Sequence, residues 1–219
     1  MLREKGFFEE QARKIHHLHR SQTLDDVKKL NDKYQNPVFG EVRISDLIQR
    51  LNQVVDPTDK ELDKVTQWGH CIQVISMMEK EGVKSEEFLV AGFVHDIGKV
   101  LLLAKENPEN VVCDNFPIGQ YSEKIGLDNV VFQWNHDEFG YMKLKNHLPD
   151  HMAKLIRYHS INPSVYKLLS DKDKWLQNNY LIPFRKYDKM SKSTTKLPVI
   201  DEDRYLKLLD KWFPKPILI

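Results

Sequence analysis

The sequence predicts an all-α protein. Apolar residues recur every three or four positions over most of the chain, capping residues precede several of these segments, and the alternating patterns typical of strands are scarce. At 219 residues, the chain is long enough to bury a sizeable core, and we expect residues 1–219 to form a single helical domain. The order of the N-terminal segment 1–20 stays open.

The expected helices follow one another in chain order. Thr23 and Ser85 are good N-caps for the segments that they begin, and Gly82 is a plausible C-cap. The longest stretch without a helical pattern is 105–120. The segments expected to be helical are 23–34, 43–55, 64–82, 85–104, 128–146, 149–161, 163–179 and 201–213.

Composition excludes several classes of function. The chain has 33 Lys and Arg against 32 Asp and Glu, so no nucleic-acid or membrane partner is expected. The N-terminus is charged and lacks the apolar core of a signal peptide. The two cysteines form no CxxC pattern, and a disulfide framework is not expected. We therefore expect a cytoplasmic monomer.

Polar residues that could bind a metal interrupt five apolar segments. The run "AGFVHDIGKVLLLA" places His95, Asp96 and Lys99 where burial is costly unless a partner compensates. A lone buried histidine is more often a core residue, but the joint pattern favours a site. Four histidines and two carboxylates suit iron, manganese or zinc. The candidate metal ligands are His70, His95, Asp96, His136, His159 and Asp188.

The remaining histidines lie among charged residues, and we expect them on the surface. They are His16, His17, His19, His147 and His151.

Longer motifs carry a resemblance to a known family. "HDIGKVL", "DNFPIG", "GLDNVVFQWNHDEFGY", "LIRYHSINP" and "FRKYDKMSK" resemble, in the same order, segments of the myo-inositol oxygenase family of the HD-domain superfamily. The likeness runs from about Gln22 to the C-terminus. "HDIGK" alone is weak, since phosphodiesterases of the superfamily share it, whereas "WNHDEFGY" with "RYHS" and "KYDKMSK" is much more specific.

The resemblance implies an HD-domain helical bundle around a dinuclear metal site. It implies two iron ions in a mixed-valent Fe(II)/Fe(III) state, dioxygen as co-substrate, and cleavage of myo-inositol to D-glucuronate. His70, His95, Asp96 and Asp188 would hold one iron. His136 and His159 would hold the second, and Asp96 would bridge the two ions.

The resemblance also implies a polyol-binding set. Its carboxylates would accept hydroxyl protons, while its lysines and its serine would donate. Lys99 is the candidate catalytic residue: it shares a helix face with His95, and neighbouring cations would lower the pKa of its amine. The candidate substrate contacts are Asp56, Asp59, Lys99, Cys113, Asp114, His159, Ser160 and Lys192.

Two departures from the family leave the substrate open. Only "QYSEKI" separates "DNFPIG" from "GLDNV", where the animal members carry a longer insert, and the family's N-terminal segment with an arginine and a tyrosine is missing. Another cyclitol, polyol or phosphorylated analogue could therefore fit. The alternative function is a metal-dependent phosphohydrolase or phosphodiesterase of the HD type. A helical scaffold without activity is the third interpretation.

Overall fold

The prediction of an all-α protein is confirmed by a computed structural model, which describes residues 2–62, 64–194 and 197–219. One short antiparallel ribbon joins β1 (Glu41–Val42) to β2 (Ile217–Leu218). The α-helices are α1 (Leu2–Arg20), α2 (Leu24–Gln35), α3 (Ile44–Gln49), α4 (Gln67–Lys80), α5 (Glu86–Val94), α6 (His136–Leu144), α7 (Asp150–Tyr158), α8 (Asp171–Leu176), α9 (Ile182–Met190) and α10 (Glu202–Trp212).

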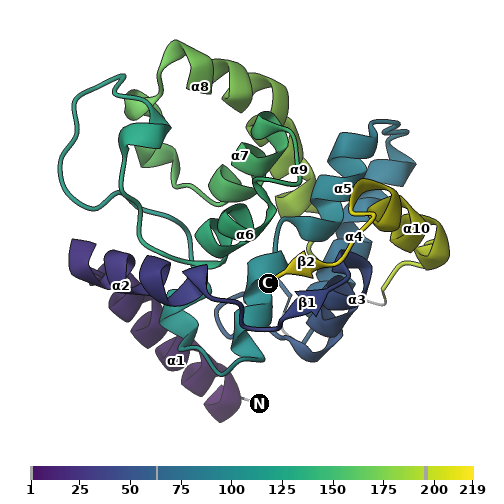
Figure 1. Ribbon diagram of the computed structural model, residues 1–219. Coiled ribbons are helices and arrows are strands. Elements are labelled where there is room, and N and C mark those ends of the chain that lie inside the picture. The colour runs from purple at the N-terminus through teal and green to yellow at the C-terminus, as the bar shows by residue number, and fades with distance from the viewer. Residues whose placement is uncertain (1, 63, 195–196) are drawn as a thin grey trace.

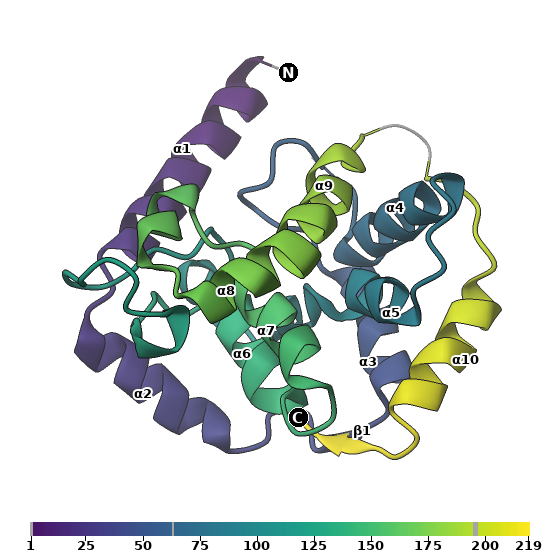
Figure 2. The same cartoon turned by 90° about the horizontal axis from the view of Figure 1, so that it is seen from above.

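The helices form a bundle whose middle is made by α6 to α9. Figures 1 and 2 show α1 and α2 on one flank, α3, α4, α5 and α10 on the other, and α6 to α9 between them. Helix α6 packs against α7, and α4 packs against α5. The ribbon of β1 and β2 ties the C-terminal end of the chain back to the segment before α3.

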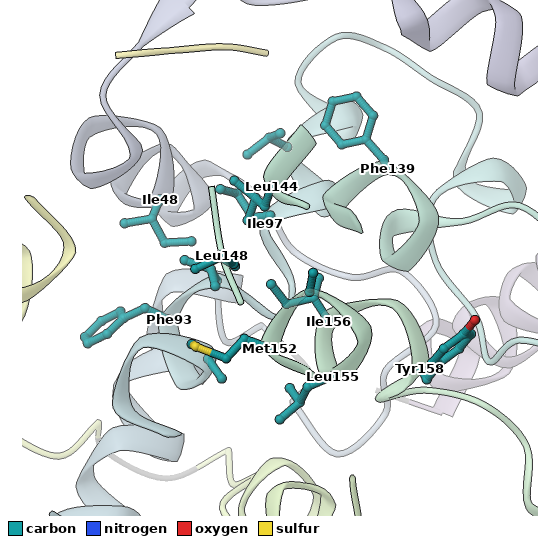
Figure 3. Close-up of a cluster of buried hydrophobic side chains, with 14 of the residues drawn as sticks. Ile48, Phe93, Ile97, Phe139, Leu144, Leu148, Met152, Leu155, Ile156 and Tyr158 are labelled. Carbon is teal, nitrogen blue, oxygen red and sulfur yellow. The ribbon is translucent and has the colours of Figure 1, made fainter. Parts of the chain in front are cut away.

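Aliphatic and aromatic side chains fill the space between the central helices. Figure 3 shows Ile97, Leu144 and Ile156 in one cluster, and each has at most 2% of its surface exposed. Burial of apolar surface at about 25 cal/mol per Å² makes this cluster a main source of stability. It also fixes the elements that carry the polar site residues.

The helix expected at 85–104 is broken where the polar residues occur. Helix α5 ends at Val94, and after a turn the chain continues as the 3₁₀ helix η2 (Ile97–Leu102). At Gly98, a Cβ atom would lie only 2.1 Å from the carbonyl oxygen of His136. Glycine therefore allows η2 and the start of α6 to approach backbone to backbone, and the turn before it directs His95 and Asp96 inward.

Two other expected helices are also divided. Within 128–146, the α-helix begins only at His136, where Oδ1 of Asn135 accepts a hydrogen bond from the backbone N–H of Asp137. Within 163–179, the chain forms the 3₁₀ helix η5 (Pro163–Leu168) and then α8. Helix α8 continues through the π-helix η6 (Gln177–Leu181) into α9, and Figure 2 shows this run as one long rod.

The N-terminal segment, whose order the sequence leaves open, forms α1. The expectation that His19 lies on the surface is wrong, because His19 is fully buried. Its ring nitrogens lie 2.8 Å from the carbonyl oxygen of Glu109 and 3.1 Å from that of Asp114. The charged neighbours in sequence point outward from α1, whereas the face with His19 packs on this loop.

Candidate metal centre

The six candidate metal ligands come from five separate elements and converge at one place. They lie on α4 (His70), in the turn after α5 (His95 and Asp96), at the start of α6 (His136), at the end of α7 (His159) and on α9 (Asp188). Their ligand atoms form two buried groups that could each hold a metal ion, His70 with His95 and Asp96, and Asp96 with His136 and His159.

Asp96 is the member that the two groups share. Its Oδ1 lies 3.0 Å from Nε2 of His136 and 3.5 Å from Nε2 of His159. Its Oδ2 lies 3.4 Å from Nε2 of His95. One carboxylate thus presents a different oxygen to each group, which is the arrangement that a bridge between two cations requires.

Asp188 joins the group of His70 and His95. Its Oδ1 lies 3.0 Å from Nε2 of His70 and 3.9 Å from Nε2 of His95. Asp188 is carried by α9, so the long run that includes η6 is the element that brings the last carboxylate to the other ligands.

The histidine rings are oriented as metal ligands commonly are. Nδ1 of His95, His136 and His159 lies 3.1, 2.7 and 2.9 Å from the backbone carbonyl oxygens of Gly92, Val111 and Ile156. With Nδ1 donating to a carbonyl oxygen, each ring can bind a cation through Nε2, the nitrogen that faces the shared carboxylate. Nε2 of His95 is buried without a hydrogen-bond partner. This orphaned nitrogen and the mixed N/O donor set fit a metal centre.

The carboxylates of the site keep their negative charge. Burial alone would raise the pKa of Asp96, but Lys99 and His95 outweigh it, and the pKa falls well below its usual range. The pKa of Asp188 is lowered in the same way: burial would raise it, but a hydrogen bond with His70 and the charge of Lys192 lower it below its usual range. Burial would lower the pKa of His136, yet Asp137 and Asp96 raise it to about 10. Such an excess of buried negative charge attracts cations.

Lys99 is a buried ammonium between carboxylates. Its Nζ lies 3.0 Å from Asp56, 3.0 Å from Asp96 and 3.0 Å from Oε1 of Gln67. Burial would lower the pKa of Lys99, but Asp96 and Asp56 raise it well above its usual range. These carboxylates stabilise the charged ammonium, and the lowered pKa expected beside two bound cations stays a prediction.

The candidate substrate contacts line one cavity of ≈ 430 Å³ beside the two metal-binding groups. Lys192 and Asp59 face the cavity as an ion pair, with Nζ of Lys192 2.6 Å from Oδ2 of Asp59. Cys113 has a backbone φ of +87°, a strained conformation for a residue with a side chain. The candidates at the cavity wall are Asp56, Asp59, Lys99, Cys113, Asp114, His159, Ser160 and Lys192.

The structure adds residues that sequence reasoning missed. His16, expected on the surface, also lines the cavity from α1. Asp137 is completely buried and accepts hydrogen bonds from Ser160 and Asn115. The signal for Asp137 is in the sequence, since His136-Asp137 is a second His-Asp pair like His95-Asp96.

Comparison with known proteins identifies the family. A family model described as "Myo-inositol oxygenase" matches residues 9–121 and 115–219. The chain belongs to the myo-inositol oxygenase family. This confirms the resemblance seen in the sequence motifs and the predicted enzyme class, because the family consists of oxygenases.

Several members of the myo-inositol oxygenase family are similar over most of their length. A probable inositol oxygenase of Oryza sativa subsp. japonica is 32% identical, over 90% of this chain and 76% of the relative. Inositol oxygenase 1 of Arabidopsis thaliana is 30% identical, with coverage of 91% and 76%. The inositol oxygenase of Danio rerio is 27% identical, with coverage of 90% and 84%.

Among the described residues, no helix is long and apolar enough to cross a bilayer.

Proposed function

We propose that this protein cleaves the ring of myo-inositol with dioxygen to give D-glucuronate, at a centre of two iron ions. The observation that carries the proposal is Asp96, which is shared by two buried ligand groups at the wall of a polar cavity. Membership of the myo-inositol oxygenase family supports the same reaction.

The residues present fit such a centre. One ion would be held by His70, His95, Asp96 and Asp188, and the other by His136, His159 and Asp96. Bound there, the ions would supply Lewis-acid and one-electron redox chemistry. The backbone carbonyls that hold Nδ1 of three histidines would keep the rings oriented when the ions are exchanged.

The chain's own residues would bind and orient the polyol. As the candidate catalytic residue, Lys99 would donate an ammonium proton to a substrate oxygen, and the carboxylates of Asp96 and Asp56, each 3.0 Å from its Nζ, would hold the ammonium in place. Asp56 and Asp114 can accept protons from substrate hydroxyls at the cavity wall. Lys192 would act from its pair with Asp59.

The phosphohydrolase alternative has less support from the family assignment, although Lys189 lines the cavity. A phosphate ester calls for free guanidinium or ammonium groups at the site. Arg157 is engaged by Glu138 at 2.7 Å. Arg185 lines the cavity but donates to the carbonyl oxygen of Ile161 and to the hydroxyl of Tyr166.

Oxygen uptake tests the proposal directly. Iron-reconstituted, partly reduced protein is given myo-inositol, and glucuronate is assayed in the same sample. Matched uptake and glucuronate are the expected result. Uptake without glucuronate, or none from protein that holds two irons, would contradict it and direct the assay to other polyols, phosphonates and then phosphate esters.

A matched pair of variants assigns the role of the lysine. Lys99→Met is expected to lower kcat at least a hundredfold while two irons remain bound, because a positioned general acid or base contributes roughly 10²–10⁴-fold. Lys143→Met, which removes a lysine on α6 away from the cavity, is the control and should retain full activity.

The monomeric state, the cytoplasmic location and the single-domain organisation stay predictions.

A further inference from the structure

Asp137 and Ser160 form a buried pair directly behind two candidate metal ligands. Each follows a ligand in sequence, Asp137 after His136 and Ser160 after His159. The hydroxyl of Ser160 donates to Oδ2 of Asp137 at 2.5 Å. The pair therefore joins the start of α6 to the end of α7, and Ser160 also lines the cavity.

Asn115 fixes the geometry of this pair from a third side. Its side-chain amide donates to the same Oδ2 of Asp137 at 3.0 Å. Its backbone N–H donates to the carbonyl oxygen of Ser160 at 3.2 Å, and its own carbonyl accepts from Asn162 at 3.0 Å. Both the backbone and the side chain of Ser160 are thus held, so its hydroxyl has little freedom to rotate.

The direction of the serine proton follows from the donor inventory. A serine hydroxyl has one proton and two lone pairs, while an ionised carboxylate can only accept. The proton of Ser160 is therefore used by Asp137, and a charge-assisted bond of this length is among the stronger ones. Toward the cavity, Ser160 has only lone pairs to offer. This reverses the role expected from the sequence, in which the serine donates to the substrate.

We propose that Asp137 is a positioning residue that fixes Ser160 as a hydrogen-bond acceptor toward the substrate. The cavity then selects a ligand that presents a hydroxyl proton at this point, as a free polyol does and an ether, a ketone or a phosphate dianion does not. The inference rests on the proposed function for the identity of the polyol.

Four variants test the positioning role in the iron-loaded enzyme with myo-inositol. Ser160→Ala and Asp137→Ala are each expected to raise KM about tenfold with kcat changed less than threefold, because one net hydrogen bond to a neutral group is lost. The double variant should be no worse than the poorer single variant. Asp137→Asn keeps an acceptor oxygen and should restore KM to within about twofold of the wild type.

Glu138→Gln is the matched control. Glu138 is the next acidic residue of α6, but it binds Arg157 and does not line the cavity, so KM should not change. Iron content is measured in every variant, since Oδ1 of Asp137 lies 2.9 Å from Nε2 of His136. A normal KM in Asp137→Ala, or an Asp137→Asn variant as impaired as Asp137→Ala, would overturn the proposal.

Substrate analogues give a second test that needs no variant of Asp137. Deoxy analogues, each lacking one hydroxyl of the substrate, identify the hydroxyl that faces Ser160. Its removal weakens binding to the wild type but not to Ser160→Ala. At that position, a fluoro-deoxy analogue can accept but cannot donate a hydrogen bond. We expect it to bind the wild type as weakly as the deoxy analogue does. Recovery of affinity by fluorine would mean that Ser160 donates, against the proposal.

Thermal unfolding separates this inference from the proposed function. Without substrate, each single variant should lower the unfolding midpoint. The sum of the shifts for Asp137→Ala and Ser160→Ala should exceed the shift of the double variant, because both single variants remove the same hydrogen bond. Additive shifts overturn the inference whatever the activity. Coupled shifts in a protein that leaves myo-inositol unchanged would support the fixed hydroxyl while the proposed function fails.

Discussion

Oδ1 of Asp96 lies 3.0 Å from Nε2 of His136, although the two residues belong to segments forty positions apart. The other oxygen of Asp96 faces His95 and the ammonium of Lys99. The carboxylate is therefore the geometric centre of the site, and what happens to it should affect both ligand groups at once.

Removal of the shared carboxylate should empty both positions. Asp96→Ala is expected to bind no iron, because each group loses an oxygen ligand, whereas His159→Ala should weaken chiefly the position shared with His136. Iron per chain, measured after reconstitution and gel filtration, checks both variants. Two irons in purified Asp96→Ala would rule out a bridging role.

The close approach at Gly98 should make this glycine irreplaceable. Gly98→Ala puts a Cβ atom 2.1 Å from the carbonyl oxygen of His136, and we expect a loss of at least about 3 kcal/mol in the free energy of unfolding together with lower iron content. Gly82→Ala meets no atom within 4 Å but has a φ of +72°, and it should cost about 1 kcal/mol. Urea unfolding compares the two. Equal losses would contradict the tight contact.

His17 and His19, both on α1, should differ sharply in their contribution to the free energy of unfolding. His19→Ala removes a buried ring that contacts two backbone carbonyls, with an expected cost of about 2–3 kcal/mol and faster amide exchange at 110–114. His17→Ala removes an exposed ring and should change the free energy of unfolding by less than about 0.5 kcal/mol. Hydrogen exchange followed by mass spectrometry is measured for both variants. Unchanged amide exchange at 110–114 in His19→Ala would show that this loop does not depend on α1.

Glu106 should make the stability depend on pH. Burial alone would raise the pKa of Glu106, but Lys33 at 2.5 Å, the hydroxyl of Tyr34 and the amide of Asn110 lower it to about 2. Because the pKa of the folded state is below the usual value near 4.5, this stabilisation is complete above pH 4.5 and is lost as pH falls toward 2.

Glu106→Gln isolates this effect from that of other carboxylates. At pH 7 the variant should be less stable than the wild type by roughly 2–3 kcal/mol, given about 1.4 kcal/mol per pKa unit. The difference should shrink steadily between pH 4.5 and 2. Unfolding by urea at several pH values measures it, and a difference that stays constant with pH would contradict the assigned pKa.

The sequence predicted the helical fold and singled out six candidate ligands that the structure places together, because apolar periodicity and an unusual set of buried polar residues are both local signals. It could not predict that α5 ends at Val94, since the segment after the turn packs on a part of the chain distant in sequence, as the close approach of Gly98 to the backbone of His136 shows. His19 was misplaced for a similar reason. Its charged neighbours describe one face of α1, while the contact with Glu109 and Asp114 comes from ninety positions away.

The role of the serine shows the same limit more clearly. Motif likeness marked Ser160 as a polyol contact but carried no information on its proton. The direction of that proton depends on Asp137 and Asn115, two residues from other parts of the chain. Such a property becomes visible only when distant donors and acceptors are counted together.

The π-helix Gln177–Leu181 accommodates, between α8 and α9, one residue more than an α-helix would use. Deletion of one of these five residues would allow a plain α-helix and leave α9 nearly in place. One residue deleted from α9 before Asp188 would instead turn that carboxylate by about 100° around the helix axis, away from His70. We expect natural relatives to tolerate a single-residue deletion within the π-helix far better than one between the π-helix and Asp188.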